Sequence, residues 1–575
     1  MRLLEPLEVT NSSTRQAPPA GKEQESRKLY RVGIVPKTQN IMETLESKFR
    51  NMHRLSRDER IQLNRELARL RPEFLENFVP RRWWWRRCEV KVLIVCDGSL
   101  NYGTGGFHLS EFLTAFNELE ARSAVDYKVT LAHRSSIVNS PNPVVVDHIG
   151  GFRFDTSVNL SDFDQVWLFA ISPSGSISAA EVAAIEQYMD GGGGLFATGD
   201  HGWLGNAMCG NIPRVKDMRY WRDFPNSNDN DNEVSMRGKR RNDTNAARPG
   251  NASASTFDHQ SDGIPQTIAV RAFGTGRPHP LLSISPSRRP SGIIDIMPDH
   301  PHEGECAPET SFTVNGINVP TQVIATSFVP GGNITSRKDP TEPHCFPSIC
   351  VWDGRAANAG RIVVDSTWHH FVNINLNGAG SGQTGLSNAD FEVIREYYMN
   401  IATWMTRRKI MWCLIRREIY ELKVASQVVE ASLNNPEESL EKIKFGDLGS
   451  IGALAEEELA SKYNPTFART FFLELLEACD TSLADQMDGW KPVRLAKESP
   501  AEAPEADWLN LDLLLHTSVG AGFIALRDNP KVNNDKAGEE VLEEVLEIFR
   551  KGMEQGLKIG LQNLERHFKG FMSRG

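Results

Sequence analysis

Four short apolar runs alternate with helix-forming segments between residues 88 and 198, and this alternation restricts the fold more than any other feature. The runs are VKVLIVC (90–96), YKVTLAH (127–133), DQVWLFAI (164–171) and LFAT (195–198). Continuous apolar runs of strand length are typical of strands that are buried on both faces of a parallel sheet. The alternation therefore predicts an α/β domain with a flavodoxin-like, doubly wound, mostly parallel sheet.

The segments between and after these runs carry further signals. A helix is expected from His108 through LSEFLTAFNELEAR, and another over 178–192. The second begins at Ser178 with Glu181 three residues later, which is the pattern of a capping box. A third helix, from Asn388 to about Arg408, closes this part of the chain. Shorter strands are expected at 267–273, 292–297, 321–328, 348–354 and 361–367.

Changes of composition divide the 575 residues into three parts. Residues 1–87 are expected to be a polar arm (1 to about 40) and a helix (41–79). They are followed by RRWWWRR (81–87), which we interpret as a packing strip rather than a patch that binds nucleic acid or an anionic surface. Residues 88–408 are the α/β domain, and residues 409–575, rich in Leu, Glu and Ala, are expected to form an all-helical module. Apolar residues nearly encircle the first helix of that module (409–422), so it should be buried against either the sheet or the downstream helices.

Composition excludes several classes of protein. A net charge of −10 gives no clear signal for nucleic-acid binding, and no run approaches the roughly 18 apolar residues of a membrane span. The first residues lack the apolar core of a signal peptide. Eight cysteines without a CxxC pair favour free thiols in a cytoplasmic setting, although Cys306, Cys345 and Cys350 leave a metal or disulfide role open.

Histidines follow several of the predicted strands. His108 comes after the first run, His201 after the fourth, and His369 and His370 after RIVVDST (361–367). In an open α/β sheet the ligand site lies beyond the carboxyl ends of the strands. We therefore expect His369 and His201 to converge on one pocket, together with a histidine of MPDHPHEGEC (297–306).

The turn GDHG (199–202), the segment 297–306 and the histidines after the first and last predicted strands supply the candidate site residues. Histidine and carboxylate side chains are the ligands of hydrolytic Zn, Mn or Fe centres, although polar loop residues that hydrogen-bond to the backbone would look the same. The sequence assigns Asp200, His201 and His369 to catalysis; His300, His302 and Glu303 to a divalent metal such as Zn; and His108, His370 and Asp299 to further binding.

VKVLIVCDG, the helix after His108, the capped helix before GGGGLFATGDHG, and GRIVVDSTWHHF resemble the class I glutamine amidotransferase-like superfamily, nearest to its trehalose-utilisation (ThuA-like) branch. The resemblance covers about residues 88–405. It implies a flavodoxin-like sandwich with a nucleophilic cysteine at the turn after a central strand and a histidine after a late strand. His369 matches that histidine, but Asp200 and His201 stand at the turn, and Cys209 is out of register. Glutaminase chemistry, which needs a thiolate at this turn, is therefore not expected.

Two classes of function follow. In the first, residues 88–405 are a hydrolase, with or without a bound metal, that acts on a small polar substrate such as a sugar or an amide. In the second, the domain has lost catalysis and binds a ligand, while the helical module recruits partners or forms a homo-oligomer. The sequence does not identify the substrate, because a fold alone does not supply one.

Overall fold

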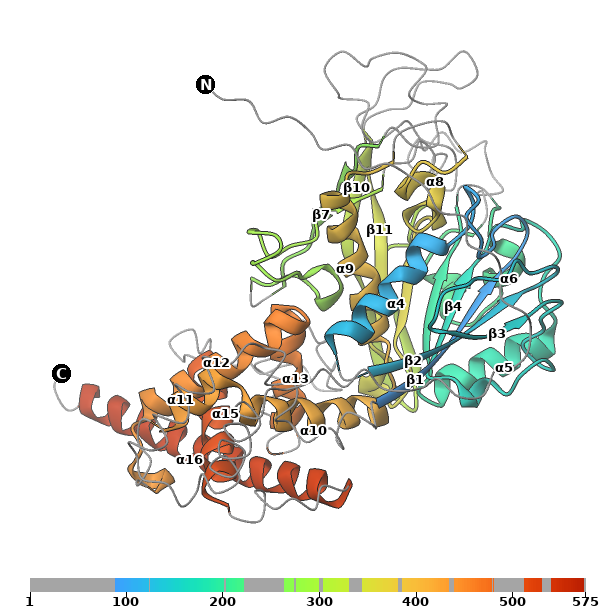
Figure 1. Cartoon of the computed structure of the whole chain (residues 1–575). Coiled ribbons are helices and arrows are strands. Elements are labelled where there is room, and N and C mark those ends of the chain that lie inside the picture. The colour runs from blue at the N-terminus through green and yellow to red at the C-terminus, as the bar shows by residue number, and fades with distance from the viewer. Residues whose placement is uncertain are drawn as a thin grey trace, which may run out of the picture. The chain divides into compact units, whose positions relative to one another are not determined.

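A computed structural model describes residues 88–572 apart from several gaps (Figure 1). The residues outside the description are 1–87, 124, 201–202, 222–262, 274–275, 299–303, 330–343, 381–384, 434–438, 478, 480–510, 530–538 and 573–575. The expected N-terminal arm, its helix and RRWWWRR lie among them.

The main sheet of the described residues has ten strands in the order β3-β2-β1-β4-β5-β12-β11-β10-β7, with β9 paired to β10. Its parallel strands are β1 (Cys88–Cys96), β2 (Val125–His133), β3 (Val145–Ile149), β4 (Gln165–Phe169), β5 (Gly194–Thr198) and β12 (Ile362–Asp365). The antiparallel strands that continue it are β11 (His344–Trp352), β10 (Ile317–Val329), β9 (Ser311–Val314) and β7 (Ala269–Val270). The expected α/β class with a mostly parallel sheet is confirmed.

The strand order identifies the topology. Without the edge strand β3, the parallel strands run β2-β1-β4-β5-β12, which is the flavodoxin-like order 2-1-3-4-5. The sequence analysis missed β3, because VVDHI is short and both Val146 and Asp147 are exposed. The strand expected at 292–297 is only β8 (Ile296–Met297), paired with β6 (Gln266–Thr267) in a separate small sheet.

Alternate side chains of β1 enter two different cores. Val92 and Ile94 pack in the cluster that contains residues of α4 (Ser110–Arg122) and α9 (Asn388–Trp404), whereas Leu93 and Val95 pack with α5 (Ala179–Asp190) and α6 (Asn206–Cys209). Figure 1 shows α4 and α5 on opposite faces of the sheet. Because both faces are covered, the strands are apolar throughout, as their sequences predicted.

Local signals fixed the start of α5. The Ser178 hydroxyl accepts a hydrogen bond from the Glu181 backbone N–H, and the Glu181 carboxylate accepts one from the Ser178 backbone N–H. This is the capping box that the sequence predicted, and it satisfies two amides that have no partner within the helix.

All longer elements after residue 407 are helices among the described residues: α10 (Arg408–Val424), α11 (Ser426–Leu433), α12 (Phe445–Lys462), α13 (Pro465–Glu477), α15 (Leu511–Asp528) and α16 (Glu539–Met572). The expected helical region is confirmed. Glycines allow α12 and α15 to touch: a Cβ on Gly452 would lie 2.0 Å from the His516 carbonyl oxygen, and one on Gly520 2.0 Å from that of Leu448. None of the described helices is long and apolar enough to cross a membrane.

The helix α10 joins the helical region to the sheet. It contacts β1 as well as α16, so both alternatives for the burial of 409–422 hold at once. Its buried apolar side chains are Met411, Leu414, Ile415, Ile419 and Leu422.

A disulfide between Cys88 and Cys413 crosses this junction. It links the first residue of β1 to α10, with the two Cα atoms 6.0 Å apart. The expectation of free thiols is therefore wrong for this pair, since partners 325 positions apart leave no spacing pattern in the sequence. Cys306, Cys345 and Cys350 form no disulfide.

We expect Cys413→Ser to lower the melting temperature, because losing a cross-link over so long a loop costs about 2–4 kcal/mol of unfolding free energy. Thermal unfolding with and without reductant measures the effect. Cys345→Ser, which removes an exposed free thiol, is the control. Equal melting of the two variants under oxidising conditions would show that the bond does not form.

Candidate functional site

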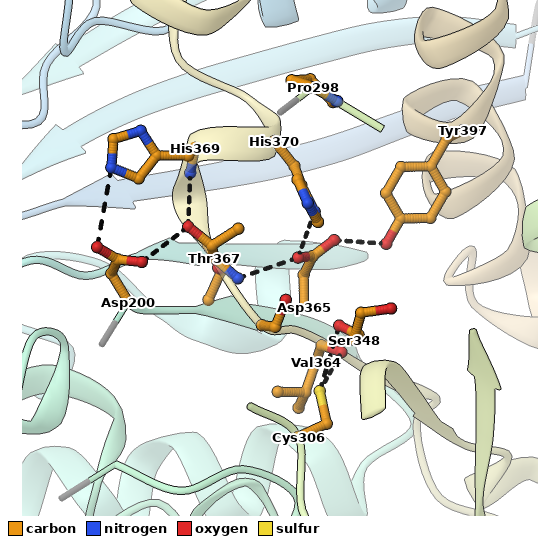
Figure 2. A network of polar contacts seen from close by, with 12 residues as sticks. Asp200, Pro298, Cys306, Ser348, Val364, Asp365, Thr367, His369, His370 and Tyr397 are labelled. Atoms are coloured by element: carbon orange, nitrogen blue, oxygen red, sulfur yellow. Dashed lines mark hydrogen bonds and ion pairs between the residues drawn. The ribbon is translucent and has the colours of Figure 1, made fainter. Parts of the chain in front are cut away.

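The candidate site lies at the carboxyl ends of two neighbouring parallel strands. β5 pairs with β12 so that Thr198 lies opposite Asp365. The chain then turns after each strand, and these turns place Asp200 beside the segment from Thr367 to His370 (Figure 2). The turns after β5 and β12 thus meet at Asp200 and His369, whereas the expected convergence of His201 with His369 stays a prediction because His201 lies outside the described residues.

Glycines make the turn after β5 tight enough to present Asp200. A Cβ on Gly199 would lie 2.6 Å from the Leu204 carbonyl oxygen, and Gly205 has a φ of +95° with its hypothetical Cβ 2.9 Å from the Gly199 Cα. The Asp200 N–H donates to the Leu204 carbonyl at 3.1 Å. The backbone thus closes on itself and the Asp200 carboxylate points toward β12.

The carboxylate of Asp200 faces two side chains of the β12 turn. The Thr367 hydroxyl donates to its Oδ1 at 3.0 Å, and its Oδ2 lies 3.8 Å from Nε2 of His369. Asp200 and His369 are each 1% exposed. The carboxylate and the imidazole are therefore both buried, and the distance between their facing atoms is longer than a hydrogen bond.

Asn375 orients the ring of His369. It lies on the short helix α8 (Asn373–Leu376), and its Oδ1 is 2.7 Å from Nδ1 of His369. An amide oxygen only accepts hydrogen bonds, so Nδ1 carries the proton and donates. The Trp368 ring stacks on the imidazole with centroids 3.9 Å apart. His369 is thereby held with Nε2 toward Asp200.

His370 belongs to a different network. Its Nδ1 donates to Asp365 Oδ1 at 2.8 Å, and its Nε2 accepts from the Gln266 amide nitrogen at 3.1 Å. Asp365 also accepts from the Thr367 N–H at 3.1 Å and from the Tyr397 hydroxyl at 2.9 Å. Burial, followed by the neighbouring Asp365, raises the pKa of Tyr397 well above its usual range. The bonds to Asp365 and Gln266 occupy both ring nitrogens of His370, and the bond from Tyr397 to Asp365 links α9 to β12.

Arg219 fastens the two strand ends together. Its guanidinium donates to the Asp200 carbonyl oxygen at 2.6 Å and to that of Ser366 at 2.7 Å, and it lies over the Trp221 ring at 4.6 Å. Arg219 is 1% exposed, and this burial lowers its pKa. Sequence reasoning missed Arg219, because 203–265 reads as irregular and carries no motif at this position.

The remaining predicted site residues fall into two groups. His201, Asp299, His300, His302 and Glu303 lie outside the described residues, so their expected convergence stays a prediction. His108 lies in the loop after β1, where its carbonyl accepts from the Asn373 N–H and a Cβ on Gly103 would meet its ring at 2.8 Å. Among the described residues no three His, Cys, Asp or Glu side chains are grouped as metal ligands.

Asp97, which the sequence analysis did not single out, occupies the end of β1 next to β4. Its Oδ1 accepts from the backbone N–H groups of Ile171 at 2.6 Å and Ser172 at 3.0 Å. Burial raises the pKa of Asp97, although these hydrogen bonds lower it. In the flavodoxin-like order this is the point where the winding direction changes and ligands commonly bind.

Cys209 does not have the character of a nucleophile. It lies at the end of α6, is 0% exposed, and burial raises the pKa of its thiol well above the ordinary range. A nucleophilic cysteine needs the opposite shift, toward the thiolate. The placement agrees with the sequence interpretation that Cys209 is out of register with the turn.

The chain matches no protein family model, and no curated protein is significantly similar to it.

We expect Gly205→Ala to destabilise the protein more than Gly175→Ala. Both glycines have a positive φ, +95° and +90°, so each substitution adds backbone strain of about 1–3 kcal/mol. Only the Gly205 Cβ would also meet neighbouring atoms, whereas nothing lies within 4 Å of the Gly175 position. Denaturant unfolding measures the difference, and equal losses would contradict the tight packing of the turn.

Proposed function

We propose that residues 88–408 form a hydrolase of the class I glutamine amidotransferase-like fold, nearest to the ThuA-like branch, that acts on a small polar substrate such as a sugar or an amide. The observation that carries this proposal is the buried pair of Asp200 and His369, with 3.8 Å between Oδ2 and Nε2 at the carboxyl edge of the sheet. A carboxylate and an imidazole so placed can both act on one water molecule between them and activate it for attack.

The residues at the turn argue against glutaminase chemistry. A glutaminase forms a thioester on a cysteine at this turn, and a carboxylate cannot form that bond. Asp200 stands there instead, and the nearest cysteine in the sequence, Cys209, is buried, which raises the pKa of its thiol. The proposal therefore keeps the fold and the late histidine, His369, but assigns attack to water.

The positioning of the pair supports a chemical role. Thr367 holds one oxygen of Asp200 and Asn375 holds the far nitrogen of His369, so the two facing atoms have fixed directions. Catalytic groups work best when neighbouring hydrogen bonds lock their geometry. His300, His302 and Glu303 would make the reaction metal-assisted, and that part of the proposal rests on the sequence alone.

A second candidate is a ligand-binding domain without catalysis. The observation that favours it is the 1% exposure of both Asp200 and His369, since buried polar networks also serve to fix a fold. In this case the helical region after residue 408 would recruit partners or form a homo-oligomer.

The test compares Asp200→Asn and His369→Gln with His148→Gln, which removes an imidazole on β3 outside the site. The assay is hydrolysis of a panel of small glycosides, amides and esters. We expect turnover by the wild type and by His148→Gln, and a loss of about 10²–10⁴-fold in the two site variants, because each removes a group that acts on the water. Full rates in folded Asp200→Asn and His369→Gln would contradict the proposal. Ligand-induced stabilisation of the wild type without turnover of any substrate would favour the second candidate.

We expect Cys209→Ala to retain full activity on the same substrates, because its buried thiol lies outside the pair. Initial rates against the wild type measure this. Loss of turnover in a folded Cys209→Ala variant would restore a thiol mechanism.

A further inference from the structure

We propose that Asp200 and His369 are two ligands of one divalent transition-metal ion. The inference rests on the proposed role of this pair in activating water, and it names the agent of that activation. It concerns residues different from His300, His302 and Glu303, to which the sequence analysis assigned the metal.

The distance between the two facing atoms is the first argument. Oδ2 of Asp200 and Nε2 of His369 are 3.8 Å apart, which exceeds a hydrogen bond. Bonds from zinc to carboxylate oxygen and to imidazole nitrogen are about 2.0–2.2 Å, so two ligands of one ion lie up to about 4 Å apart. The observed separation fits an ion held between the two atoms.

The orientation of the His369 ring is the second argument. Nδ1 faces the Oδ1 atom of Asn375, so Nε2 is the ring nitrogen that is turned toward the carboxylate of Asp200. An imidazole nitrogen and a carboxylate oxygen that face each other in this way can bind the same metal ion.

The supporting hydrogen bonds are the third argument. Histidines that bind a metal commonly donate their other N–H to an oxygen, and carboxylate ligands are in turn hydrogen-bonded. Asn375 and Thr367 provide these two contacts, at 2.7 Å and 3.0 Å. Both partners are neutral, so they orient the ligands without adding a competing charge.

Two other His–carboxylate pairs show what a pair without room for an ion looks like. His370 lies 2.8 Å from Asp365, and His516 lies 2.9 Å from Glu456. In both pairs a nitrogen and an oxygen are in direct hydrogen-bond contact. The pair of Asp200 and His369 differs by its wider gap.

The donor atoms also select the class of ion. Imidazole nitrogen with carboxylate oxygen suits Zn²⁺, Fe²⁺, Co²⁺ or Mn²⁺, whereas Mg²⁺ and Ca²⁺ prefer sites built from oxygen alone. Such an ion lowers the pKa of a bound water toward neutrality, which is the activation that hydrolysis requires.

The experiment measures metal binding directly, without a substrate. Full-length protein without an affinity tag is stripped with chelator, reloaded with Zn²⁺ or Co²⁺, dialysed and analysed for metal content. We expect about one equivalent at this site, and a rise in melting temperature that Mg²⁺ does not give. Asp200→Asn and His369→Gln should each lose that equivalent, while His516→Gln, the matched control, should keep it.

Variants of the supporting residues give a graded readout. Thr367→Val and Asn375→Ala leave both ligands in place, so they should weaken Co²⁺ binding by about 10–100-fold rather than abolish it. Unchanged metal content in folded Asp200→Asn and His369→Gln would overturn the inference, as would a wild type that binds no transition metal, in which case the pair is a protonated His–Asp ion pair.

The outcome is separable from that of the proposed function. Metal bound through Asp200 and His369 in a protein that hydrolyses nothing would overturn the hydrolase and keep the metal site. Hydrolysis at full rate by a wild type that binds no transition metal would overturn the metal site and keep the hydrolase.

Discussion

The parallel pairing of β5 with β12 brings the site together. Thr367 and Asp200 are 167 positions apart in the chain, yet their side chains are hydrogen-bonded because Thr198 and Asp365 lie side by side at the ends of their strands. Arg219 donates to a carbonyl oxygen on each of the two turns and so links the turn after β5 to the turn after β12. A shift in the register between β5 and β12 would separate Asp200 from His369. It would also leave the buried guanidinium of Arg219 without its two carbonyl acceptors.

The adjacent residues His369 and His370 lie on the same turn but contact different partners. His370 is buried with Asp365 and Gln266 on its two nitrogens, so its hydrogen bonds serve the fold. His369 has one nitrogen fixed by Asn375 and the other directed toward Asp200 across a wider gap. Sequence neighbours on an irregular turn point in different directions, so one short segment both contacts α9 and presents an imidazole to Asp200.

Much of the α/β part was predictable, because its signals are local. Apolar runs indicated the strands, a capping box indicated the start of α5, and the rule that parallel strands end at one edge placed the turns after β5 and β12 together. The supporting residues were not predictable, since Thr367, Asn375 and Arg219 acquire their roles only from contacts across the fold. The same holds for the disulfide and for β3, whose exposed side chains break the apolar pattern. The sequence-assigned metal residues lie outside the described part.

The disulfide has a topological consequence. The bond between Cys88 and Cys413 closes residues 88–413 into a covalent ring that contains every strand of the sheet. Most of the helical region follows residue 413 and so forms a tail outside the ring. A peptide bond broken inside the ring would leave both pieces attached through sulfur, and a break in the tail would release a free fragment. Reduction abolishes this difference, so the chain is a closed loop in an oxidising compartment and a linear polymer in a reducing one.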